Sequence, residues 1–448
     1  MFNRKIITYL DEWKKRVNHK PLVLRGARQV GKTSAVLIFA KKHFKHVIHL
    51  NLEKAEHHRL FKNDLSLNEF LTVVKAEWKE PIVSGETLIF MDEIQNAPSL
   101  IKLLRFFYEE RPDLHVLAAG SLLEAKIEKE GFSFPVGRVG FCYLYPMDFF
   151  EYLDAKGERE LLQILREADF GQDIPVAIHQ MAVTHFYEYA MIGGMPEIIG
   201  EYLQHKDMNR VKTLFSALLT GYLEDVFKYA SQAEAKYLSH IIETAPFFVG
   251  TQITYEKFGG SRFRSREMGK AFSLLEKVML LSQIRATSSK NLPFIPKEKR
   301  AKKLIFLDAG MVNYRMNILN EYLSITDFDH FYQGRLAEQI VAQNLFSLFM
   351  DVPPEIYYWS RDKKEGSAET DFCLNVAGRT LGIEVKSGKT GRLKSLCIFA
   401  QQNQKNLLMR VYSGELKKEK IGEFNLISLP FYLVPKILEF ASAEVKMK

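Results

Sequence analysis

Cysteine is scarce in this chain of 448 residues, and no long apolar run occurs in it. Cys142, Cys373 and Cys397 are far apart and lack the spacing of metal ligands, which argues against a zinc site or a disulfide framework and for a reducing compartment. No window approaches about 18 apolar residues without a charge, so no membrane span is expected. The charged, amphipathic start of the chain is unlike a secretory signal. We therefore expect a cytoplasmic protein without a membrane partner.

Tryptophan is also rare. Trp13, Trp78 and Trp359 form no spaced array on which single-stranded nucleic acid would stack. Hydrophobic residues make up 47% of the chain and charged residues 26%, which is ordinary for a globular protein. Because one hydrophobic core rarely serves more than about 300 residues, the length predicts two to four domains.

An excess of positive charge is confined to one part of the chain. The formal net charge is +8, and residues 255–303 alone carry 13 Lys and Arg against four Glu. The remainder is therefore close to neutral. We call residues 255–303 the basic segment, and a basic balance confined to one segment predicts a polyanion partner there.

One short motif carries the first chemical prediction. Residues 26–33 fit G-x-x-x-x-G-K-[ST] at every fixed position, between an apolar strand predicted at 21–24 and a helix predicted at 32–44. Glycines at both ends let successive backbone N–H groups converge on a phosphate chain. The alternative, a glycine turn with a chance Gly-Lys-Thr, is disfavoured by the flanking strand and helix. The predicted ATP-binding residues are Gly26, Ala27, Arg28, Gln29, Val30, Gly31, Lys32, Thr33 and Ser34.

Within this loop, two side chains have distinct expected roles. Lys32 would reach the β- and γ-phosphates as a catalytic cation, and the Thr33 hydroxyl would bind Mg²⁺. A buried strand predicted at 87–91 ends in Asp92 and Glu93. Asp92 would lie beside Thr33 and hold Mg²⁺ directly or through water, and Glu93 is the candidate base for the attacking water.

Two further residues are candidates for the same site. Ser121 follows a strand predicted at 114–119, where a small polar side chain can reach the γ-phosphate or the attacking water. It can also cap a helix predicted at 122–129, and the two roles are compatible. Arg138 lies on a loop bounded by proline and glycine. It can stabilise phosphoryl charge from a neighbouring subunit or domain, or it can pin the loop to a carboxylate.

A recognisable pattern runs through most of the chain, in the segments PLVLRGARQVGKTS, TLIFMDEIQ, LAAGSLLE, FPVGRV and YLYPMDFFEYL. It continues through GGMPE at 193–197 and YLEDV at 222–226. The pattern resembles a bacterial and archaeal group of AAA-type ATPases fused to a downstream domain of unknown function. The resemblance implies an additional-strand P-loop fold, with a sensor strand between the two nucleotide-motif strands and a helical lid after the sheet. It implies no particular substrate.

The middle of the chain is predicted to hold a lid and a DNA-binding module. Helical periodicity dominates residues 148–230, which favours a lid that closes over ATP, or simple packing against the sheet. The following elements resemble a winged helix, with three helices and two β-like runs at 234–244, 255–258, 265–278, 280–285 and 303–307. Arg262, Arg264, Arg266 and Lys270 cluster at the start of the third helix, where phosphate contacts to DNA are expected. A winged module used for protein contacts is the alternative.

The last part of the chain carries a second group of acids. Glu338 lies near the start of a predicted helix, Asp371 in a predicted strand, and Glu384 and Lys386 on one face of the next strand. Two carboxylates can hold Mg²⁺ while a lysine orients water. The order resembles the D…ExK core of restriction-endonuclease-like nucleases with a leading helical glutamate. Glu338, Asp371 and Glu384 are the predicted metal ligands, and Asp371, Glu384 and Lys386 the predicted catalytic residues. A degenerate fold used for binding is the alternative, and Lys389, Arg392 and Lys394 would suit a phosphate backbone.

Together these patterns predict an α/β protein with an AAA-type P-loop core at 1–150, a helical lid at 151–230, a winged helix at 231–308 and a nuclease-like mixed α/β domain at 309–448. The predicted function is ATP binding and hydrolysis with Mg²⁺, coupled to DNA binding by the basic segment and to metal-dependent DNA cleavage. The alternative is a non-cleaving ATP-dependent switch whose carboxyl-terminal domains bind only DNA or a protein partner. The pattern is compatible with a homo-oligomer.

Overall fold

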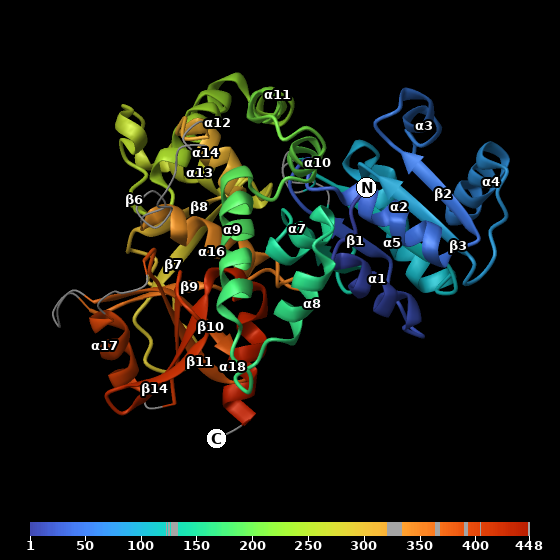
Figure 1. The fold of residues 1–448 in the computed structure, drawn as a ribbon. Coiled ribbons are helices and arrows are strands. Elements are labelled where there is room, and N and C mark those ends of the chain that lie inside the picture. The colour runs from blue at the N-terminus through green and yellow to red at the C-terminus, as the bar shows by residue number, and fades with distance from the viewer. Residues whose placement is uncertain are drawn as a thin grey trace. The chain divides into compact units, whose positions relative to one another are not determined.

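The computed structural model describes residues 1–121, 123, 126, 133–319, 334–362, 368–388, 393–403 and 405–446. The chain forms two compact units (Figure 1). Unit 1 is Met1–Tyr145 with two short pieces, Lys277–Met279 and Phe349–Pro353. Unit 2 is Pro146–Glu276, Leu280–Leu348 and Pro354–Lys448. Residues 151–230, 231–308 and 309–448, predicted as three domains, all belong mainly to unit 2.

Unit 1 is built on a sheet of five parallel strands in the order β2-β3-β4-β1-β5. The strands are β1 (Leu22–Arg25), β2 (His46–Asn51), β3 (Thr87–Asp92), β4 (His115–Gly120) and β5 (Gly140–Tyr143). Every residue of β3 and β4 is buried, which explains why their sequences are apolar without alternation. The prediction of a parallel sheet is confirmed, and β4 lies between the two strands that carry the nucleotide motifs, as the resemblance implied.

Helices α1, α2, α4 and α5 contribute buried side chains to unit 1. The described helices of unit 1 are α1 (Ile6–Lys15), α2 (Lys32–His43), α3 (Ala55–Leu60), α4 (Leu67–Trp78), the 3-10 helix Ile94–Asn96 and α5 (Pro98–Glu110). Ser66 and Glu69 form a capping box at the start of α4, which fixes the beginning of this helix. The short helix α3 was not predicted, and none of its residues is buried. Of the helix predicted at 122–129, only residues 123 and 126 are described.

The first part of unit 2 is helical, as its periodicity indicated. It contains α7 (Phe149–Lys156), α8 (Arg159–Glu167), α9 (Val176–Ile192), α10 (Pro196–His205) and α11 (Met208–Tyr229). The helical region is interrupted between α9 and α10, because Gly193 ends α9 with a positive φ and Pro196 begins α10.

The next elements follow the predicted order with one difference. They are α12 (Gln232–Thr244), the 3-10 helix Ala245–Phe248, β6 (Gln252–Ile253), the 3-10 helix Phe258–Gly260, α13 (Ser265–Lys277), β7 (Leu281–Thr287) and β8 (Lys302–Phe306). The predicted helix at 255–258 is wrong, since only a 3-10 turn forms there. Gly259 and Gly260 both have positive φ, a conformation that stops a helix.

One sheet of nine strands extends through the rest of unit 2, in the order β13-β14-β12-β11-β10-β9-β7-β8-β6. Its further elements are α14 (Ala309–Arg315), α16 (Arg335–Phe346), β9 (Tyr357–Ser360), β10 (Glu369–Val376), β11 (Arg379–Val385), α17 (Lys394–Gln402), β12 (Leu407–Tyr412), β13 (Lys417–Ile421), β14 (Phe424–Pro430), the 3-10 helix Phe431–Lys436 and α18 (Ile437–Lys446). β7 pairs in parallel with β9. The strands of the predicted winged helix and of the predicted nuclease-like domain therefore share one continuous sheet.

Buried polar side chains also join α9, α14 and α16 inside unit 2. The carboxylate of Asp308 accepts hydrogen bonds from the backbone N–H of Gly194 at 2.6 Å and from the Gln343 amide at 3.2 Å. The Tyr189 hydroxyl accepts from Gln343 and Asn344, at 3.3 Å each. Burial raises the pKa of Asp308 to about 6, although these N–H donors favour its charged form. The helices predicted as a lid are thus bonded to the carboxyl-terminal part of the same unit.

Candidate functional site

The glycine-rich loop between β1 and α2 has the backbone that its sequence predicted. A Cβ at Gly26 would lie 2.5 Å from the carbonyl oxygen of Leu144, so no side chain fits there. Gly31 has φ 93° and begins α2, which is a conformation that glycine adopts without strain. The ammonium of Lys32 donates to the carbonyl oxygens of Gly26 at 3.0 Å and Ala27 at 2.8 Å. Burial lowers its pKa, while the carboxylates of Glu93 and Asp92 act in the opposite direction.

Arg4 supports this loop from the start of the chain, a role that sequence reasoning missed. Its guanidinium donates to the backbone oxygen of Val30 at 2.7 Å and to that of Tyr145 at 2.7 Å. Because Arg4 is buried, water does not compete for these hydrogen bonds, and they hold the loop in place. Nothing in the local sequence could reveal the contact with Tyr145, 141 residues away.

Thr33 and Asp92 meet at the carboxyl end of β3. The Thr33 hydroxyl donates to Asp92 Oδ2 at 2.8 Å, and His49 Nε2 lies 3.5 Å from the same oxygen. Asp92 Oδ1 is buried without a hydrogen-bond partner. A buried carboxylate oxygen without a donor, next to a threonine hydroxyl, is a donor set that fits Mg²⁺. His49 was missed, although the parallel register of β2 and β3 brings the carboxyl ends of both strands together.

Glu93 leaves the strand in a left-handed conformation with φ 54°. Its carboxylate Oε2 accepts a hydrogen bond from the Gln95 amide, and Ser121 Oγ donates to the same oxygen at 3.4 Å. Ser121 follows directly after β4, so the structure brings the predicted base and the predicted sensor residue together. Gln95 was not predicted. Its only sequence signal is its position two residues after the acidic pair.

Arg138 is bonded to α5 in the described structure. Its Nε donates to Glu109 Oε1 at 2.8 Å, and its guanidinium lies 5.9 Å from the centre of the Tyr108 ring. This contact corresponds to the alternative in which the arginine pins its loop to a carboxylate. A role of Arg138 at the nucleotide stays a prediction.

The carboxyl-terminal acids come together on α16, β10 and β11. Asp371 Oδ2 accepts from the backbone N–H of Val385 at 2.8 Å. Lys386 Nζ donates to Glu384 Oε1 at 2.7 Å, whereas Glu384 Oε2 is buried without a partner. The acid cluster, as we call it, consists of Glu338, Glu369, Asp371 and Glu384.

A lysine that sequence reasoning missed lies among these acids. Lys303 Nζ, from β8, is 2.7 Å from Glu338 Oε2 and 3.4 Å from both Glu369 Oε1 and Asp371 Oδ1. Burial and the charge of Asp371 raise the pKa of Glu338 to about 8, and the same two causes raise that of Glu384 to about 7. Among the described residues, no group of three or more His, Cys, Asp or Glu side chains is arranged to hold a metal ion.

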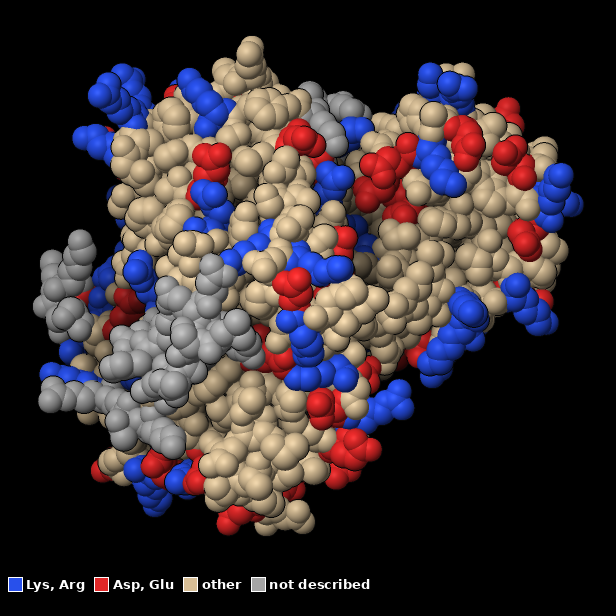
Figure 2. All heavy atoms as spheres, turned by 45° about the horizontal axis from the view of Figure 1, so that its top comes forward, with Lys and Arg blue, Asp and Glu red and all other residues tan. Residues whose placement is uncertain are grey.

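The basic segment separates into exposed and buried residues. Arg262, Arg264, Arg266 and Lys270 are exposed, and none of them forms an ion pair with a residue that the structure describes. Figure 2 shows Lys and Arg side chains standing out at the edge of unit 2 that carries α12 and α13. Lys303 is buried, so the number of basic residues in the sequence overstates the exposed charge. Of the three further basic residues predicted to suit a phosphate backbone, Lys389 and Arg392 lie outside the described residues.

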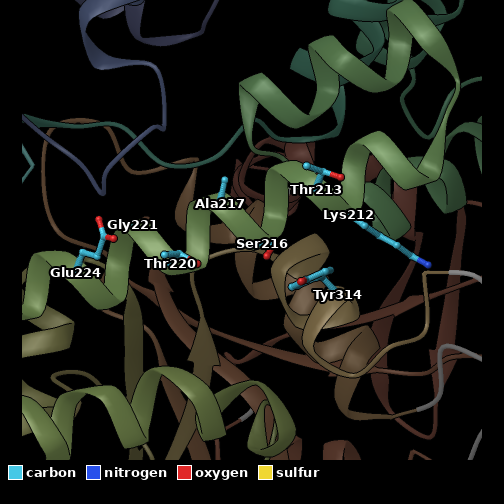
Figure 3. Close-up of a pocket in the computed structure, with 8 residues that line it drawn as sticks. All are labelled: Lys212, Thr213, Ser216, Ala217, Thr220, Gly221, Glu224 and Tyr314. Carbon is cyan, nitrogen blue, oxygen red and sulfur yellow. The ribbon is translucent and has the colours of Figure 1, made fainter.

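Unit 2 also contains an open pocket with a volume of about 680 Å³. Figure 3 shows its lining side chains along α11, with Tyr314 of α14 beside them. The α11 residues are Lys212, Thr213, Ser216, Ala217, Thr220, Gly221 and Glu224. None of the predicted site residues lines it. No helix in the described part of the chain has both the length and the apolar character needed to cross a membrane.

Comparison with protein families divides the chain into three matched regions. Residues 18–153 match an AAA domain. Residues 183–322 match a domain of unknown function (DUF8612), and residues 333–432 match another (DUF4143). A search among curated proteins gave no match.

Solved structures show only distant likeness to the chain. The Walker-type ATPase PABY2304 of Pyrococcus abyssi is 18% identical, with a TM-score of 0.45, and the match covers 70% of this chain and 96% of that one. Drosophila ORC bound to DNA is 13% identical, with a TM-score of 0.24 and coverage of 69% and 84%. The ORC2 protein of Aeropyrum pernix is 11% identical, with a TM-score of 0.22 and coverage of 71% and 92%. TM-scores this low do not establish a common fold.

The glycine-rich loop, the parallel sheet and the family match agree with one another. The amino-terminal part of the chain is an AAA domain of the P-loop type, and it is followed by two domains of unknown function.

Proposed function

We propose that this chain binds ATP with Mg²⁺ and hydrolyses it to ADP and phosphate. The observation that carries the proposal is the meeting of Lys32, Thr33, Asp92 and Glu93 at one edge of the unit 1 sheet. Each belongs to a different functional class: a buried cation, a hydroxyl, a carboxylate with an unpartnered oxygen and a second carboxylate held by an amide. P-loop ATPases use such groups for phosphoryl transfer to water: a lysine at the phosphates, a hydroxyl and a carboxylate at Mg²⁺, and a residue that positions the water.

The residues have the following roles in the proposed reaction. Lys32 would exchange its bonds with the loop carbonyls for bonds to the β- and γ-phosphates, and Thr33 and Asp92 would hold Mg²⁺. When bound there, Mg²⁺ would neutralise charge on the phosphate oxygens. Glu93 accepts a proton from water as the water oxygen bonds to the γ-phosphorus and the bond to the β,γ-bridging oxygen breaks. Gln95 and Ser121 keep the Glu93 carboxylate oriented toward that water.

Two substitutions test this assignment. Lys32→Ala should abolish turnover because it removes the cation that contacts the phosphates. Glu93→Gln should lower kcat by roughly 100-fold or more while ATP binding is largely kept, because only proton transfer is removed. Phosphate release under saturating ATP and a separate binding titration measure the two effects. Normal turnover in Glu93→Gln would remove Glu93 from the role of base.

DNA binding is a second proposed function, and it depends on the exposed arginines around the start of α13. Arg262, Arg264, Arg266 and Lys270 lie within nine residues of one another and are all exposed. Such a group releases counterions when it neutralises phosphates, so affinity should fall steeply with salt. The order of α12, β6, α13, β7 and β8 is compatible with the proposed winged helix. A protein-binding role for the same face is the competing outcome.

Salt titration of duplex binding distinguishes these outcomes. Arg264→Ala and Arg266→Ala should each reduce the slope of log K against log salt by about 0.9, the value for one lost phosphate contact. Lys75→Ala, an exposed lysine on α4, is the matched control and should leave the slope unchanged. Repeating the titration with an ATP analogue reports the coupling between nucleotide and DNA. A slope near zero for the wild type would contradict DNA binding.

The acid cluster bears on the choice between the two versions of the predicted function. Metal-dependent cleavage needs Asp371 and Glu384 to be open to a divalent cation. The position of Lys303 among the acids supports instead the alternative of a non-cleaving, ATP-dependent switch.

A further inference from the structure

Lys303 reaches the acid cluster from a different part of the sheet. It lies on β8, which pairs with β7 and β6, whereas its partners lie on α16 and β10. Only 2% of its surface is exposed. Its Nζ also faces the rings of Tyr358 and Phe372, at 5.6 and 5.7 Å from their centres. The ammonium is therefore enclosed by carboxylates and aromatic faces, with little access for water.

The contacts of this ammonium are those of a cation at the centre of an acidic site. It lies 2.7 Å from Glu338 and 3.4 Å from both Glu369 and Asp371. Carboxylate oxygens bind Mg²⁺ at about 2.0–2.1 Å and Ca²⁺ at about 2.3–2.6 Å. A metal ion bound by the same oxygens would overlap the nitrogen, so the two cations exclude each other.

The remaining acid has its own lysine. Glu384 Oε1 accepts from Lys386 Nζ, and the side chain is otherwise buried. Four carboxyl groups and two ammonium groups thus form one compact arrangement. Attraction to Asp371, Glu338 and Glu369 outweighs the burial of Lys303 and holds its pKa well above the ordinary value, so the ammonium stays charged.

We propose that the Lys303 ammonium occupies the place of a divalent cation in the acid cluster, so that unit 2 folds around a covalently attached cation and binds no metal there. The inference is independent of ATP hydrolysis, because it concerns side chains of unit 2 only. It assigns to the D…ExK-like residues a structural role with Lys303, in place of metal-dependent cleavage.

The test removes the ammonium and asks whether a metal ion takes its place. Full-length wild type, Lys303→Ala and Lys302→Ala are stripped with EDTA and kept free of nucleotide. Lys302 is the matched control, because it is the preceding residue of β8 and its Nζ lies near Tyr255 rather than the acids. Thermal melting in EDTA and in Mn²⁺, together with Mn²⁺ binding followed by electron paramagnetic resonance, is measured for each.

For the wild type, the melting temperature in EDTA should equal that in Mn²⁺, and the same should hold for Lys302→Ala. Lys303→Ala should melt roughly 5–10 °C lower in EDTA, because the carboxylates lose their counter-charge. Mn²⁺ should restore at least half of that loss, with one additional bound ion per chain. The double variant Lys303→Ala with Asp371→Asn should lose both the rescue and the additional ion.

Two results would overturn the proposal. One is a folded Lys303→Ala protein that gains no Mn²⁺ site. The other is a wild-type protein that binds Mn²⁺ without nucleotide, or cleaves DNA with it, and loses this property in Asp371→Asn. Should Lys303→Ala fail to fold in either buffer, the comparison of wild type with Asp371→Asn decides alone, and equal Mn²⁺ binding by the two supports the proposal.

Discussion

At the scale of single residues, the Glu93 carboxylate depends on a neighbour to which the sequence patterns assigned no role. The left-handed backbone at Glu93 turns the chain back so that the Gln95 amide can donate to it. Gln95 is itself almost fully buried beside the end of β4, where a Cβ at Gly120 would lie 2.2 Å from its Oε1. We therefore regard Gln95 as a positioning residue for the proposed base.

Gln95→Leu tests this role. The substitution keeps the size of the side chain but removes the hydrogen bond, so kcat for ATP should fall roughly 10- to 100-fold while the affinity for ATP stays the same. Asn96→Ala is the control: it removes the adjacent amide, which accepts from Lys126 at 3.0 Å, and should leave kcat near the wild-type value. Equal losses of affinity and turnover in Gln95→Leu would indicate general damage to the site instead.

Residue by residue, local motifs were predictable and long-range partners were not. Lys32, Thr33, Asp92 and Glu93 stand in short patterns whose spacing reflects the turn and the strand end that they form. Arg4 contacts Tyr145, which is 141 residues away in the sequence. Lys303 contacts Glu338 and Asp371, which are 35 and 68 residues away. Contacts of this kind arise from tertiary packing, which a local pattern does not encode.

At the scale of elements, the start of β4 carries a titratable group inside the core of unit 1. The ring of His115 stacks on His19 with 3.9 Å between centroids, and it meets the edges of Trp13 and Phe44. Its Nε2 lies 3.3 Å from the backbone oxygen of Lys14 at the end of α1. Burial lowers the pKa of His115 to about 4.

This depressed pKa predicts acid sensitivity of unit 1. The unfolded chain takes up a proton at His115 near pH 6.5 but the folded chain only near 4, so stability is full above pH 6.5 and falls as the pH drops toward 4. The total loss from this group is about 3 kcal/mol. Urea unfolding between pH 5 and 7.5 should show the slope, and His115→Phe should flatten it.

Phe44→Leu is the matched control for that measurement. It weakens the same ring cluster without removing a titratable group, so it should lower stability at every pH and leave the slope unchanged. A slope that His115→Phe does not reduce would assign the acid sensitivity to other groups.

Helices and strands begin and end close to their predicted positions where the sequence has capping residues or apolar runs. Strands β3, β4, β10 and β11 lie close to their predicted positions. The pairing of β7 with β9 was not foreseen, because strand neighbours far apart in sequence are chosen by the packing of whole layers. The same pairing brings β8, and with it Lys303, to the acids on β10.

At the scale of the whole molecule, the proposed nucleotide site lies in unit 1, and the exposed arginines around the start of α13 and the acid cluster lie in unit 2. In unit 2 the proposed lid is bonded through Asp308 and Tyr189 to α14 and α16. A displacement of the helices of the proposed lid should therefore be transmitted to α14 and α16 rather than absorbed by a flexible linker. This arrangement suits a switch whose state is set by nucleotide and read by a partner.

The proposed ATP hydrolysis and its coupling to DNA binding both depend on nucleotide binding by unit 1. The most direct test is an equilibrium titration of the purified full-length chain with Mg²⁺ and a fluorescent ATP analogue, in parallel with Lys32→Ala. We expect saturable binding of one nucleotide per chain, weakened at least about tenfold in Lys32→Ala because the phosphates lose a charge-assisted contact. No detectable affinity of the wild type for any magnesium-bound purine triphosphate would contradict it.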